Sequence, residues 1–371
     1  MSKRYARFLT AVFCLFLGGL MVWQMLLPDR ERSDVENRTL QQRPALTLSS
    51  VLDGSYMEDV EAYVQDQFPL RDQWTGLKAR TEQLIGKRLF NNIYLCEGET
   101  LISKVDAPAD GLEKANLNYV SQLAEKSDIP MYLGLIPSAA EVWRDKLPEG
   151  AESWDQNAYL SQAAGLGLPM IDFSAALTAH ADEPIFYRTD HHWTTEAAYY
   201  VYAAWAEEKG LSPLALSDYK KKTLTDGFFG TVDAKVGGRN RSDTIHVYIP
   251  KKKEKYQVNY VTKNETADDI YQYDYLKTRD KYSVYFGGNQ SLVEVKTDSK
   301  SKRKLLVVQD SYAHCFIPFT LHDFKEVDFV DLRYYSESLK EYMEKGDYTD
   351  VLFLYNAAGF AEDNSLIKLG N

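Results

Sequence analysis

Two polar segments of the sequence contain the residue types that serine-dependent acyl transfer uses. Asp190 and His192 stand two positions apart, and Ser311 follows the apolar run Lys304–Val308. An imidazole within hydrogen-bond reach of a serine can take its proton, and a carboxylate on the other ring nitrogen fixes the tautomer. In an extended segment residues i and i+2 share a side, whereas His191 would point the other way. The spacing predicts a base and its orienting carboxylate from one loop.

Each of these features also has a simpler explanation when it is taken alone. A serine after a strand is common, and the Asp-His-His-Trp cluster could cap a helix, bind a metal or merely pack. As a metal site the cluster is weak, because adjacent histidines diverge and no second pair of His, Cys or Asp ligands has suitable spacing. We therefore expect no metal and no cofactor. Spacing alone leaves a serine triad and a structural role equally open.

The segments that must position these residues are predicted to alternate between strand and helix. Short apolar runs bounded by turn residues predict buried strands, and these cover residues 130–136, 184–188, 304–308 and 351–355. Alternating units of this kind imply an α/β fold, with a mostly parallel sheet and helices on both faces. Reactive side chains collect at the carboxyl ends of such strands. Asp190 with His192, Ser311 and Asn356 stand at three of these ends.

Helical spacing of apolar residues and a β-rich segment complete the predicted domain. The predicted helices cover residues 56–87 with a break at 67–69, 111–126, a start at Ser138 with a capping box to Glu141, 194–210, and 311–322. Residues 211–300 are rich in Tyr, Lys and Asp and predict a β-rich insertion, with half-exposed strands at 256–261 and 282–286. We interpret the insertion as part of the main domain.

The amino terminus contains an apolar run long enough to cross a membrane. Residues 8–27 carry no charge, and about 20 residues span a hydrocarbon core of roughly 30 Å. Lys3, Arg4 and Arg7 precede the run, so the positive-inside tendency leaves the amino terminus in the cytoplasm and the rest outside. A cleaved signal peptide is the alternative, but no small-x-small cleavage site follows. We expect a cytoplasmic tip and signal anchor (1–27), a stalk with little regular structure (28–55) and one α/β domain (56–371).

Composition excludes several classes of protein. The 371 residues carry 43 basic and 54 acidic side chains, a formal charge of −11, which argues against nucleic acid as a partner. A hydrophobic content of 44% excludes disorder along the whole chain. Outside the apolar run only Cys96 and Cys315 could form a disulfide. The 26 tyrosines are a surplus that often lines sugar grooves, although packing accounts for most such surpluses.

The segment Asp190–Thr194 resembles the bacterial family named after its DHHW motif. Further motifs of the resemblance follow in order: ENRTL (36–40), FPLRD (68–72), FFGT (228–231), FGGN (286–289), VQDSY (308–312) and DLRYY (331–335). The family is similar to the alginate O-acetylation proteins, whose SGNH-hydrolase-like domain uses a serine with an Asp-x-His pair. In those relatives the pair precedes the serine, in reverse of the order in ordinary SGNH hydrolases. This chain has the reversed, permuted order.

The resemblance implies a two-step acyl transfer outside the membrane. Ser311 would be the nucleophile, His192 the general base and Asp190 its orienter. Ser311 would attack an acetyl ester handed over by a membrane-bound O-acyltransferase and form an acetyl-serine. A hydroxyl of a cell-surface polysaccharide would then take the acetyl group, while attack by water would make the protein an esterase.

The resemblance also implies roles for residues around the serine. Asn356 resembles the SGNH asparagine that donates to the oxyanion, and Asn289 is its rival. Arg333 and Tyr312 would bind substrate or help hold the site, with a structural ion pair as the alternative for Arg333. The family's usual glycine before Asp-Ser is Gln309 here. A side chain at this position could narrow the turn, which puts the shape of the substrate site in question more than the nucleophile. Two other functions stay open: a non-catalytic glycan-binding or scaffold protein with a decayed hydrolase fold, and a metal-dependent phosphoesterase.

Overall fold

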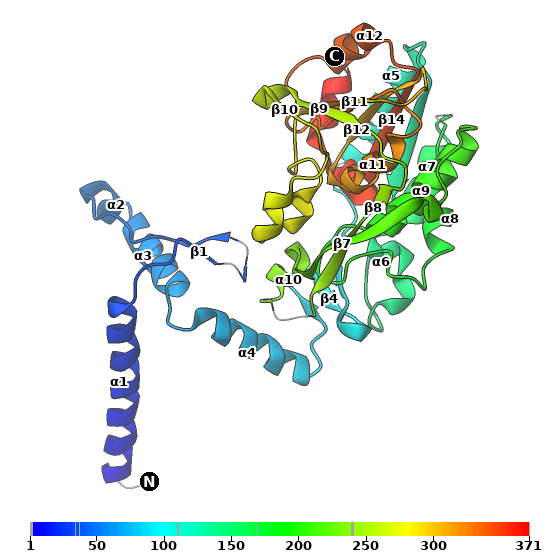
Figure 1. The fold of residues 1–371 in the computed structure, drawn as a ribbon. Coiled ribbons are helices and arrows are strands. Elements are labelled where there is room, and N and C mark those ends of the chain that lie inside the picture. Colours follow the sequence, from blue (N-terminus) through cyan, green and yellow to red (C-terminus); the bar gives the residue numbers. More distant parts are fainter. Residues whose placement is uncertain are drawn as a thin grey trace. The chain divides into compact units, whose positions relative to one another are not determined.

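The computed structural model describes residues 3–33, 35–36, 38–109, 111–167, 169–238 and 241–370 (Figure 1). Contacts within the chain divide it into two compact units. The first contains residues 1–87 and 234–239, and the second contains residues 88–233 and 240–371. The residues with the predicted chemistry all belong to the second unit.

The first unit consists of helices and one small pair of strands. Its elements are α1 (Lys3–Leu26), β1 (Arg32–Ser33), β2 (Arg38–Thr39), α2 (Leu48–Leu52), α3 (Ser55–Asp66) and α4 (Arg71–Leu84). By length and composition, α1 could cross a membrane, and none of its residues is buried. The predicted helix break is confirmed, because α3 ends before Phe68-Pro69 and Leu70 takes a φ of 56° ahead of α4.

The predicted stalk has more structure than its composition suggested. It contains α2 and the β1–β2 pair, and the ENRTL motif contributes β2; Asn37 of that motif lies outside the described residues. Arg38 of this motif binds both carboxylate oxygens of Asp66, at 2.8 and 2.5 Å. Glu36 accepts from Arg71 of the FPLRD motif at 2.6 Å. Ion pairs between residues far apart in sequence therefore order this segment, which local spacing could not predict.

A seven-stranded mixed sheet forms the centre of the second unit, in the order β10-β9-β11-β13-β12-β14-β6. Its strands are β6 (Met131–Ile136), β9 (Tyr256–Tyr260), β10 (Glu265–Ala267), β11 (Leu292–Thr297), β12 (Lys304–Gln309), β13 (Glu326–Val330) and β14 (Asp350–Asn356). The pairs from β13 to β6 are parallel, and those from β10 to β13 are antiparallel. The prediction of a mostly parallel sheet is therefore wrong for half of it. The short turn between β9 and β10 is one reason, since parallel neighbours need a longer crossover.

The segment 211–300 contributes both to this sheet and to a separate ribbon. β9, β10 and β11 extend the main sheet, while β7 (Tyr219–Phe228) and β8 (Asp243–Pro250) pair with each other. The strand predicted at 282–286 is wrong, because residues Lys281–Val284 form the 3-10 helix η6. A smaller sheet contains β3 (Leu89–Phe90), β4 (Ile93–Leu95) and β5 (Leu101–Ser103).

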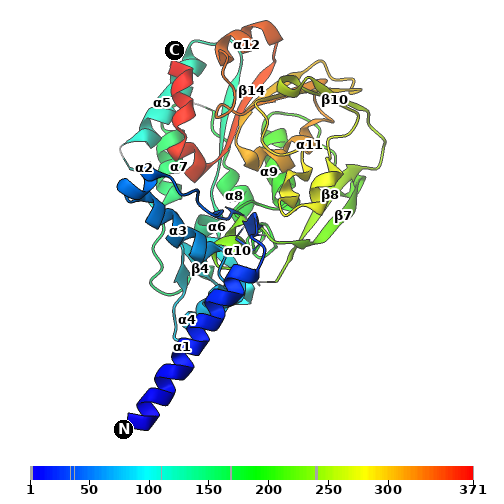
Figure 2. The ribbon, with the colours of Figure 1, turned by 90° about the vertical axis from the view of Figure 1, so that its left-hand side faces the viewer.

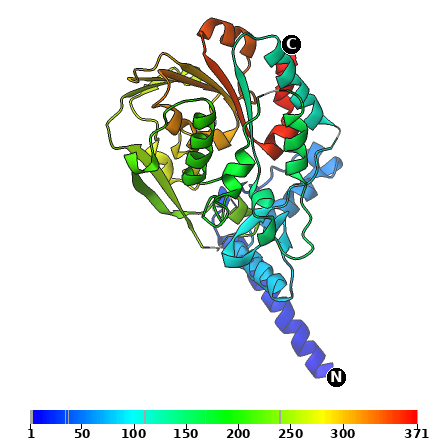
Figure 3. The same ribbon diagram turned by 90° about the vertical axis from the view of Figure 1, so that its right-hand side faces the viewer.

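Helices cover both faces of the main sheet, as predicted. One face packs against α5 (Leu112–Glu125), α7 (Gln156–Ala164), α12 (Leu339–Gly346), α13 (Ala357–Glu362) and the 3-10 helix η8 (Asn364–Gly370). The other packs against α6 (Ala139–Val142), α8 (Phe173–Thr178), α9 (Thr195–Glu208), α11 (Ile317–Thr320) and the 3-10 helix η7 (Ser311–Cys315). Figure 2 shows α5 and α7 on one side of β14 and α9 and α11 on the other, and Figure 3 shows the same layers from the opposite side. Alternate residues of the strands supply the two cores.

Local sequence signals near the site had mixed success. The helix predicted from Thr194 is confirmed as α9, whose first turn receives a side-chain cap from Thr194. The capping box predicted at Ser138 is absent from α6, because the hydroxyl of Ser138 instead accepts a hydrogen bond from Gln156 at 2.8 Å. The strand predicted at 184–188 reduces to an isolated bridge between Phe186 and Trp193. Here Phe186 pairs with a residue only seven positions later in the chain, and not with a strand of the main sheet.

Shorter elements complete the second unit. They are η1 (Glu97–Glu99), η2 (Arg144–Lys146), η3 (Leu216–Asp218), η4 (Val261–Lys263), η5 (Tyr273–Lys277) and α10 (Thr231–Lys235), whose last two residues belong to the first unit. All three cysteines are free, so the disulfide considered from the sequence does not form. Cys315 is buried behind the serine, and burial raises the pKa of its thiol to about 12.

Candidate active site

Asp190, His192 and Ser311 form one continuous chain of hydrogen bonds, although 119 positions separate the histidine from the serine. Nδ1 of His192 lies 2.5 Å from Oδ1 of Asp190, and Nε2 lies 2.8 Å from Oγ of Ser311. Since an ionised carboxylate can only accept, the proton on Nδ1 faces Asp190 and leaves Nε2 free to accept the serine proton. The geometry is that of a serine paired with a base and a carboxylate.

Buried hydrogen bonds hold Asp190 in its ionised form. Oδ1 accepts from the backbone N–H of His192 at 3.0 Å, and Oδ2 accepts from the N–H and hydroxyl of Thr231 at 2.8 and 3.1 Å. Burial by itself would raise the pKa of Asp190, but the neighbouring imidazoles of His191 and His192 and these hydrogen bonds lower it well below its usual range. The carboxylate therefore keeps its charge at neutral pH.

The FFGT motif supplies the space and the donors for this carboxylate. A Cβ atom on Gly230 would lie 2.2 Å from Cβ of Asp190, so a side chain cannot be added there without displacing the aspartate. Thr231, the next residue, supplies the hydrogen bonds to Oδ2. Asp243 fixes Thr189, the residue before Asp190, because Oδ2 of Asp243 accepts from the N–H and hydroxyl of Thr189 at 2.8 and 2.6 Å.

Ser311 stands on the turn between the central strand β12 and the helix η7. Asp310 caps this turn: its Oδ1 accepts from the N–H of Tyr312, and its Oδ2 accepts from the N–H of Asn356 at the end of β14, both at 2.9 Å. Burial raises the pKa of Asp310 to about 6, opposed by these two bonds and by the charge of Arg333. The carboxyl ends of two adjacent parallel strands are thereby joined beneath the serine.

Tyr282 is a site residue that the sequence did not single out. Its ring stacks on the imidazole of His192, with centroids 3.8 Å apart and planes 14° from parallel. Its hydroxyl donates to the backbone carbonyl of Ser311 at 3.2 Å. Tyr282 therefore contacts both the base and the turn that carries the serine. Its position four residues before the FGGN motif was the one available signal.

The two predicted oxyanion donors have different surroundings. Asn356 is buried, its Oδ1 caps α13, and one N–H of its amide donates to the carbonyl of Ile136 at 3.2 Å. An amide nitrogen has a second N–H, so an oxyanion role for Asn356 stays compatible with this arrangement. Asn289 is exposed, and its amide donates to the hydroxyl of Tyr334 at 3.3 Å. Neither role is tested by these contacts, and both stay predictions.

Arg333 and Tyr312 are both tied to neighbouring residues. Arg333 forms a two-bond ion pair with the fully buried Asp331, at 2.9 and 2.6 Å, so the structural alternative considered for it is present. Tyr312 is buried, and its hydroxyl donates to the carbonyl of His191. Its own carbonyl accepts from the indole N–H of Trp193 at 2.8 Å. Tyr312 therefore fastens the DHHW loop to η7, while direct substrate binding by either residue stays a prediction.

Two buried polar side chains beside the serine have no hydrogen-bond partner among the described residues. They are Gln309, directly before Asp310-Ser311, and His314 in η7. Burial lowers the pKa of His314 to about 3, so its imidazole is neutral. Gln309 is fully buried, which means that its side chain does not narrow the exposed side of the turn as its bulk suggested.

Residues of the DHHW cluster lie close enough together to bind a metal ion, but ring nitrogens of both histidines already form hydrogen bonds. The expectation that the adjacent histidines diverge is wrong, because the ring centroids of His191 and His192 lie 3.9 Å apart, and Asp190, His191 and His192 can each offer one ligand atom within 4.8 Å of the others. Both ring nitrogens of His192 are engaged, and Nδ1 of His191 lies 2.8 Å from the hydroxyl of Thr231. A metal ion would have to displace these hydrogen bonds, so the donor set fits proton transfer better than coordination.

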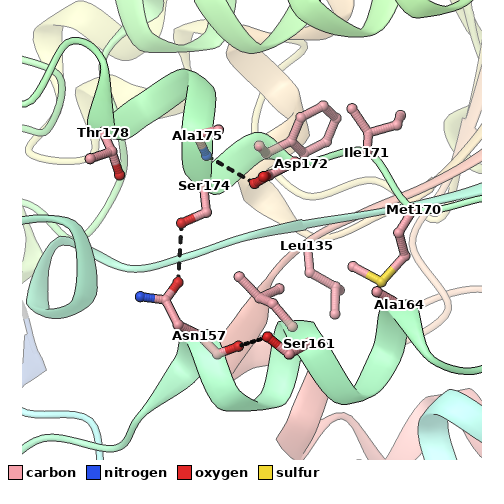
Figure 4. Close-up of a pocket in the computed structure, with 12 residues that line it drawn as sticks. Leu135, Asn157, Ser161, Ala164, Met170, Ile171, Asp172, Ser174, Ala175 and Thr178 are labelled. Atoms are coloured by element: carbon pink, nitrogen blue, oxygen red, sulfur yellow. Dashed lines mark hydrogen bonds between the residues drawn. The ribbon is translucent and has the colours of Figure 1, made fainter.

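Two grooves lie elsewhere on the second unit. One, with a volume of ≈ 390 Å³, is lined by polar and aromatic residues that include Tyr260, Lys263, Gln272 and Tyr275, and it reaches Gly287 of the FGGN motif. The other, of ≈ 450 Å³, lies between α7 and α8 (Figure 4). In it the hydroxyl of Ser174 donates to Asn157 at 3.1 Å. None of the three residues of the Asp–His–Ser chain lines either groove.

Residues 169–330 match the family described as DHHW protein. The resemblance to this family is confirmed. The match includes the Asp-x-His pair, the serine and the FFGT and FGGN motifs. No curated protein matches the sequence.

Solved structures share the fold. A DHHW family protein from Eubacterium siraeum is 26% identical and has a TM-score of 0.65, with 76% of this chain and 96% of that chain covered. PatB1 from Bacillus cereus, solved with a sulfonyl adduct, is 18% identical with a TM-score of 0.61 and coverage of 74% and 96%. The O-acetyltransferase domain of AlgJ from Pseudomonas putida is 14% identical with a TM-score of 0.47 and coverage of 74% and 93%. The first two likenesses support a mixed α/β fold of this type for the second unit.

Proposed function

We propose that this chain is a membrane-anchored, extracytoplasmic O-acetyltransferase or acetylesterase that acts on a cell-surface polysaccharide through an acetyl-serine. The observation that carries the proposal is the pair of short hydrogen bonds from Asp190 through His192 to Ser311, at 2.5 and 2.8 Å. Proton transfer needs a heavy-atom separation of roughly 2.6–3.2 Å, which the serine and histidine already have. A decayed hydrolase fold would be under no pressure to keep this chain intact, so the geometry favours an enzyme over a binding protein.

In the proposed first step, Ser311 attacks the carbonyl carbon of an acetyl ester. Its hydroxyl proton moves to Nε2 of His192 as the new C–O bond forms, and Asp190 stabilises the imidazolium. The C–O bond to the leaving group then breaks, and His192 returns the proton to the departing oxygen. The acetyl group is left as an ester on Ser311. Asn356 is our candidate donor to the developing oxyanion, with its second amide N–H.

In the second step, a hydroxyl of the acceptor replaces the leaving group. His192 takes the acceptor proton, the acceptor oxygen attacks the acetyl-serine, and the proton returns to Oγ of Ser311. A sugar hydroxyl as acceptor gives transfer, and water gives hydrolysis. The groove lined by Tyr260, Gln272 and Tyr275, which does not contain the Asp–His–Ser residues, is our candidate surface for sugar units of the polysaccharide beyond the reacting one, because aromatic faces and amide groups suit sugar rings.

The proposed location follows from α1. We infer that α1 is an uncleaved signal anchor, that the second unit lies on the extracytoplasmic side, and that a membrane-bound O-acyltransferase supplies the acetyl ester. The three basic residues before the apolar run support this orientation. The neighbour AlgJ is named as an O-acetyltransferase domain; the activity proposed for this chain rests on its own residues.

The proposal is tested with a chromogenic acetyl ester and the full chain. Wild-type protein should release the chromophore with a burst, and mass spectrometry should find one acetyl group on Ser311. Ser311→Ala should abolish both signals, while Ser161→Ala, which removes a hydroxyl on α7 that bonds only its own helix, should keep them. A sulfonyl reagent of the kind recorded on PatB1 should modify wild-type protein at Ser311 and block turnover. Equal rates for wild type and Ser311→Ala, without acetylated Ser311, would refute the proposal.

A further inference from the structure

The helix α4 carries a row of exposed apolar side chains along one side. Trp74, Leu77, Leu84 and the cap residue Ile85 are 45, 54, 88 and 80% exposed. With Thr81, they recur at intervals of three and four residues, which places them on one side of a helix. The buried residue of α4 is Gly76, on the opposite side. An apolar row of this length on a 14-residue helix needs a partner that is itself apolar.

Hydrogen bonds within the first unit fix the start of α4 beside the end of α1. The amide of Gln24 donates to the carbonyl of Val64 at 3.1 Å, which joins the last turns of α1 and α3. Arg30 then bonds both sides of the α3–α4 connection. Its N–H donates to Gln67 at 2.9 Å, and its guanidinium donates to Asp72 in the first turn of α4 at 2.8 Å.

The membrane boundary must lie near these bonds if α1 crosses the bilayer. A helix of 24 residues is about 36 Å long, only slightly more than a hydrocarbon core of roughly 30 Å. Gln24 and Arg30 therefore stand at the polar boundary, and so does the first turn of α4. In Figure 1, α4 begins near the level of the carboxyl-terminal end of α1 and slants away from α1. A helix that begins at this level can reach the lipid headgroups.

The charges of α4 suit the same surroundings. Lys78 and Arg80 lie on either flank of the apolar row, and both are exposed. Long basic side chains can extend to phosphates while their stems stay beside acyl chains. A tryptophan near the start of the helix is also typical of the membrane boundary, where its ring meets lipid and its N–H meets water.

We propose that α4 lies in the membrane interface, with Trp74, Leu77, Leu84 and Ile85 in contact with lipid. The inference rests on the proposed role of α1 as an anchor. Interfacial helices of this kind bury their apolar side roughly 5–10 Å into the boundary between headgroups and acyl chains. A second attachment beside α1 prevents the first unit from rotating freely about a single helix, and the hydrogen bonds of Arg30 with Gln67 and Asp72 hold the two attachments together.

The test measures lipid contact at single positions of the full chain. A nitroxide label is attached to Leu77→Cys on the apolar row or to Gln83→Cys on the opposite, exposed side of α4, in a background with Cys14→Ala and Cys96→Ser. Cys315 stays in place because it is fully buried. Each protein is reconstituted into vesicles of phosphatidylcholine with a minority of phosphatidylglycerol. Collisions of the label with oxygen, which enters lipid, are compared with collisions with a water-soluble nickel complex.

We expect the label at position 77 to favour oxygen and the label at position 83 to favour nickel. Equal, nickel-favouring values at both positions would overturn the inference, as would protection of position 77 from both reagents, since that would mean protein contact instead of lipid contact. Labelled Cys14 in α1 is the control for the anchor: a nickel-favouring value there would refute the proposed anchor itself, separately from α4. Quenching of Trp74 fluorescence by brominated lipids, taken as the difference from Trp74→Phe, should agree without any cysteine substitution.

Discussion

Replacement of Asp190 by asparagine keeps the size of the side chain but changes one of its oxygen acceptors into a donor. In the structure, Oδ1 receives Nδ1–H and the backbone N–H of His192, while Oδ2 receives the N–H and hydroxyl of Thr231. An amide has only one oxygen, so it cannot accept hydrogen bonds from the donors of both His192 and Thr231. If its NH₂ group faces Thr231, it meets a backbone N–H at a contact of 2.8 Å. If it faces His192, Nδ1 must become the acceptor.

The second orientation changes the tautomer of His192 and thereby removes the base. With the proton on Nε2, the imidazole can no longer accept the proton of Ser311, which lies 2.8 Å away. The same change in another serine enzyme lowers kcat by about 10⁴-fold, which corresponds to about 5.5 kcal/mol at about 1.4 kcal/mol per tenfold. We expect a loss of about 10³–10⁴-fold in kcat/KM for Asp190→Asn, together with a free energy of unfolding lower by roughly 1.5–3 kcal/mol for the lost charged hydrogen bonds.

The assay is hydrolysis of the chromogenic acetyl ester, with urea unfolding measured on the same preparations. Thr231→Val is the matched control, because it removes the hydroxyl bond to Oδ2, together with the hydroxyl contact to Nδ1 of His191, and keeps the N–H bond to Oδ2. We expect it to cost no more than about tenfold in kcat/KM, in line with about 1 kcal/mol for one such bond. Asp190→Asn protein that is folded and keeps more than about a tenth of the wild-type kcat/KM would refute the assigned tautomer.

Three further outcomes follow from the same contacts. Tyr282→Phe removes one hydroxyl bond to the serine turn but keeps the ring on His192, so its kcat/KM should fall by less than about tenfold. Tyr282→Ala also removes the ring, so its kcat/KM should fall by much more. Equal losses for the two variants would contradict the stacking role. Gln309→Met removes two unpaired buried polar atoms at similar volume and should raise the free energy of unfolding by roughly 1–3 kcal/mol in urea titrations; a lower value would show that the amide has a partner. Burial raises the pKa of Asp310 to about 6, whereas the same carboxyl group in the unfolded chain loses its proton near pH 4. The contribution of this proton to stability is therefore fully present below about pH 4 and is lost as the pH rises through about 6. The free energy of unfolding of wild type relative to Asp310→Asn should fall by about 2–3 kcal/mol over that interval, and a parallel pH dependence for the two proteins would contradict the assigned pKa.

Local patterns in the sequence were sufficient for the parts of the site that depend on short spacing. Asp190 and His192 are two residues apart, and Ser311 follows a strand whose apolar run is unbroken, so both could be placed at strand or loop ends without any knowledge of packing. The break between α3 and α4 and the start of α9 were predicted for the same reason. Proline, capping residues and side-chain alternation act within a few residues of the chain.

Contacts between distant segments decided what those patterns could not. Gly230 and Thr231 shape the pocket of Asp190 from about forty positions away, and Tyr282 stacks on His192 from the other side. Gly230 has no local signal of such a role, and for Tyr282 the one signal, its position before the FGGN motif, does not reveal which side chain it contacts. The bulk of Gln309 suggested a narrowed turn, but its side chain is buried. Gln309 is the last residue of a strand, and the face of the sheet toward which a strand side chain points follows from the alternation along that strand and from what packs on each face.

The sequence by itself therefore determined which chemical groups are available, namely a serine and an Asp-x-His pair in permuted order. It also determined that they belong to an acidic α/β domain that follows an apolar segment long enough to cross a membrane. Only the tertiary structure decided that the serine and histidine lie 2.8 Å apart, that half of the sheet is antiparallel and that α4 starts beside the end of α1. The reason is physical. Residue type and spacing fix what a side chain can donate, accept or bury, whereas a distance between residues 119 positions apart depends on how all the intervening elements pack.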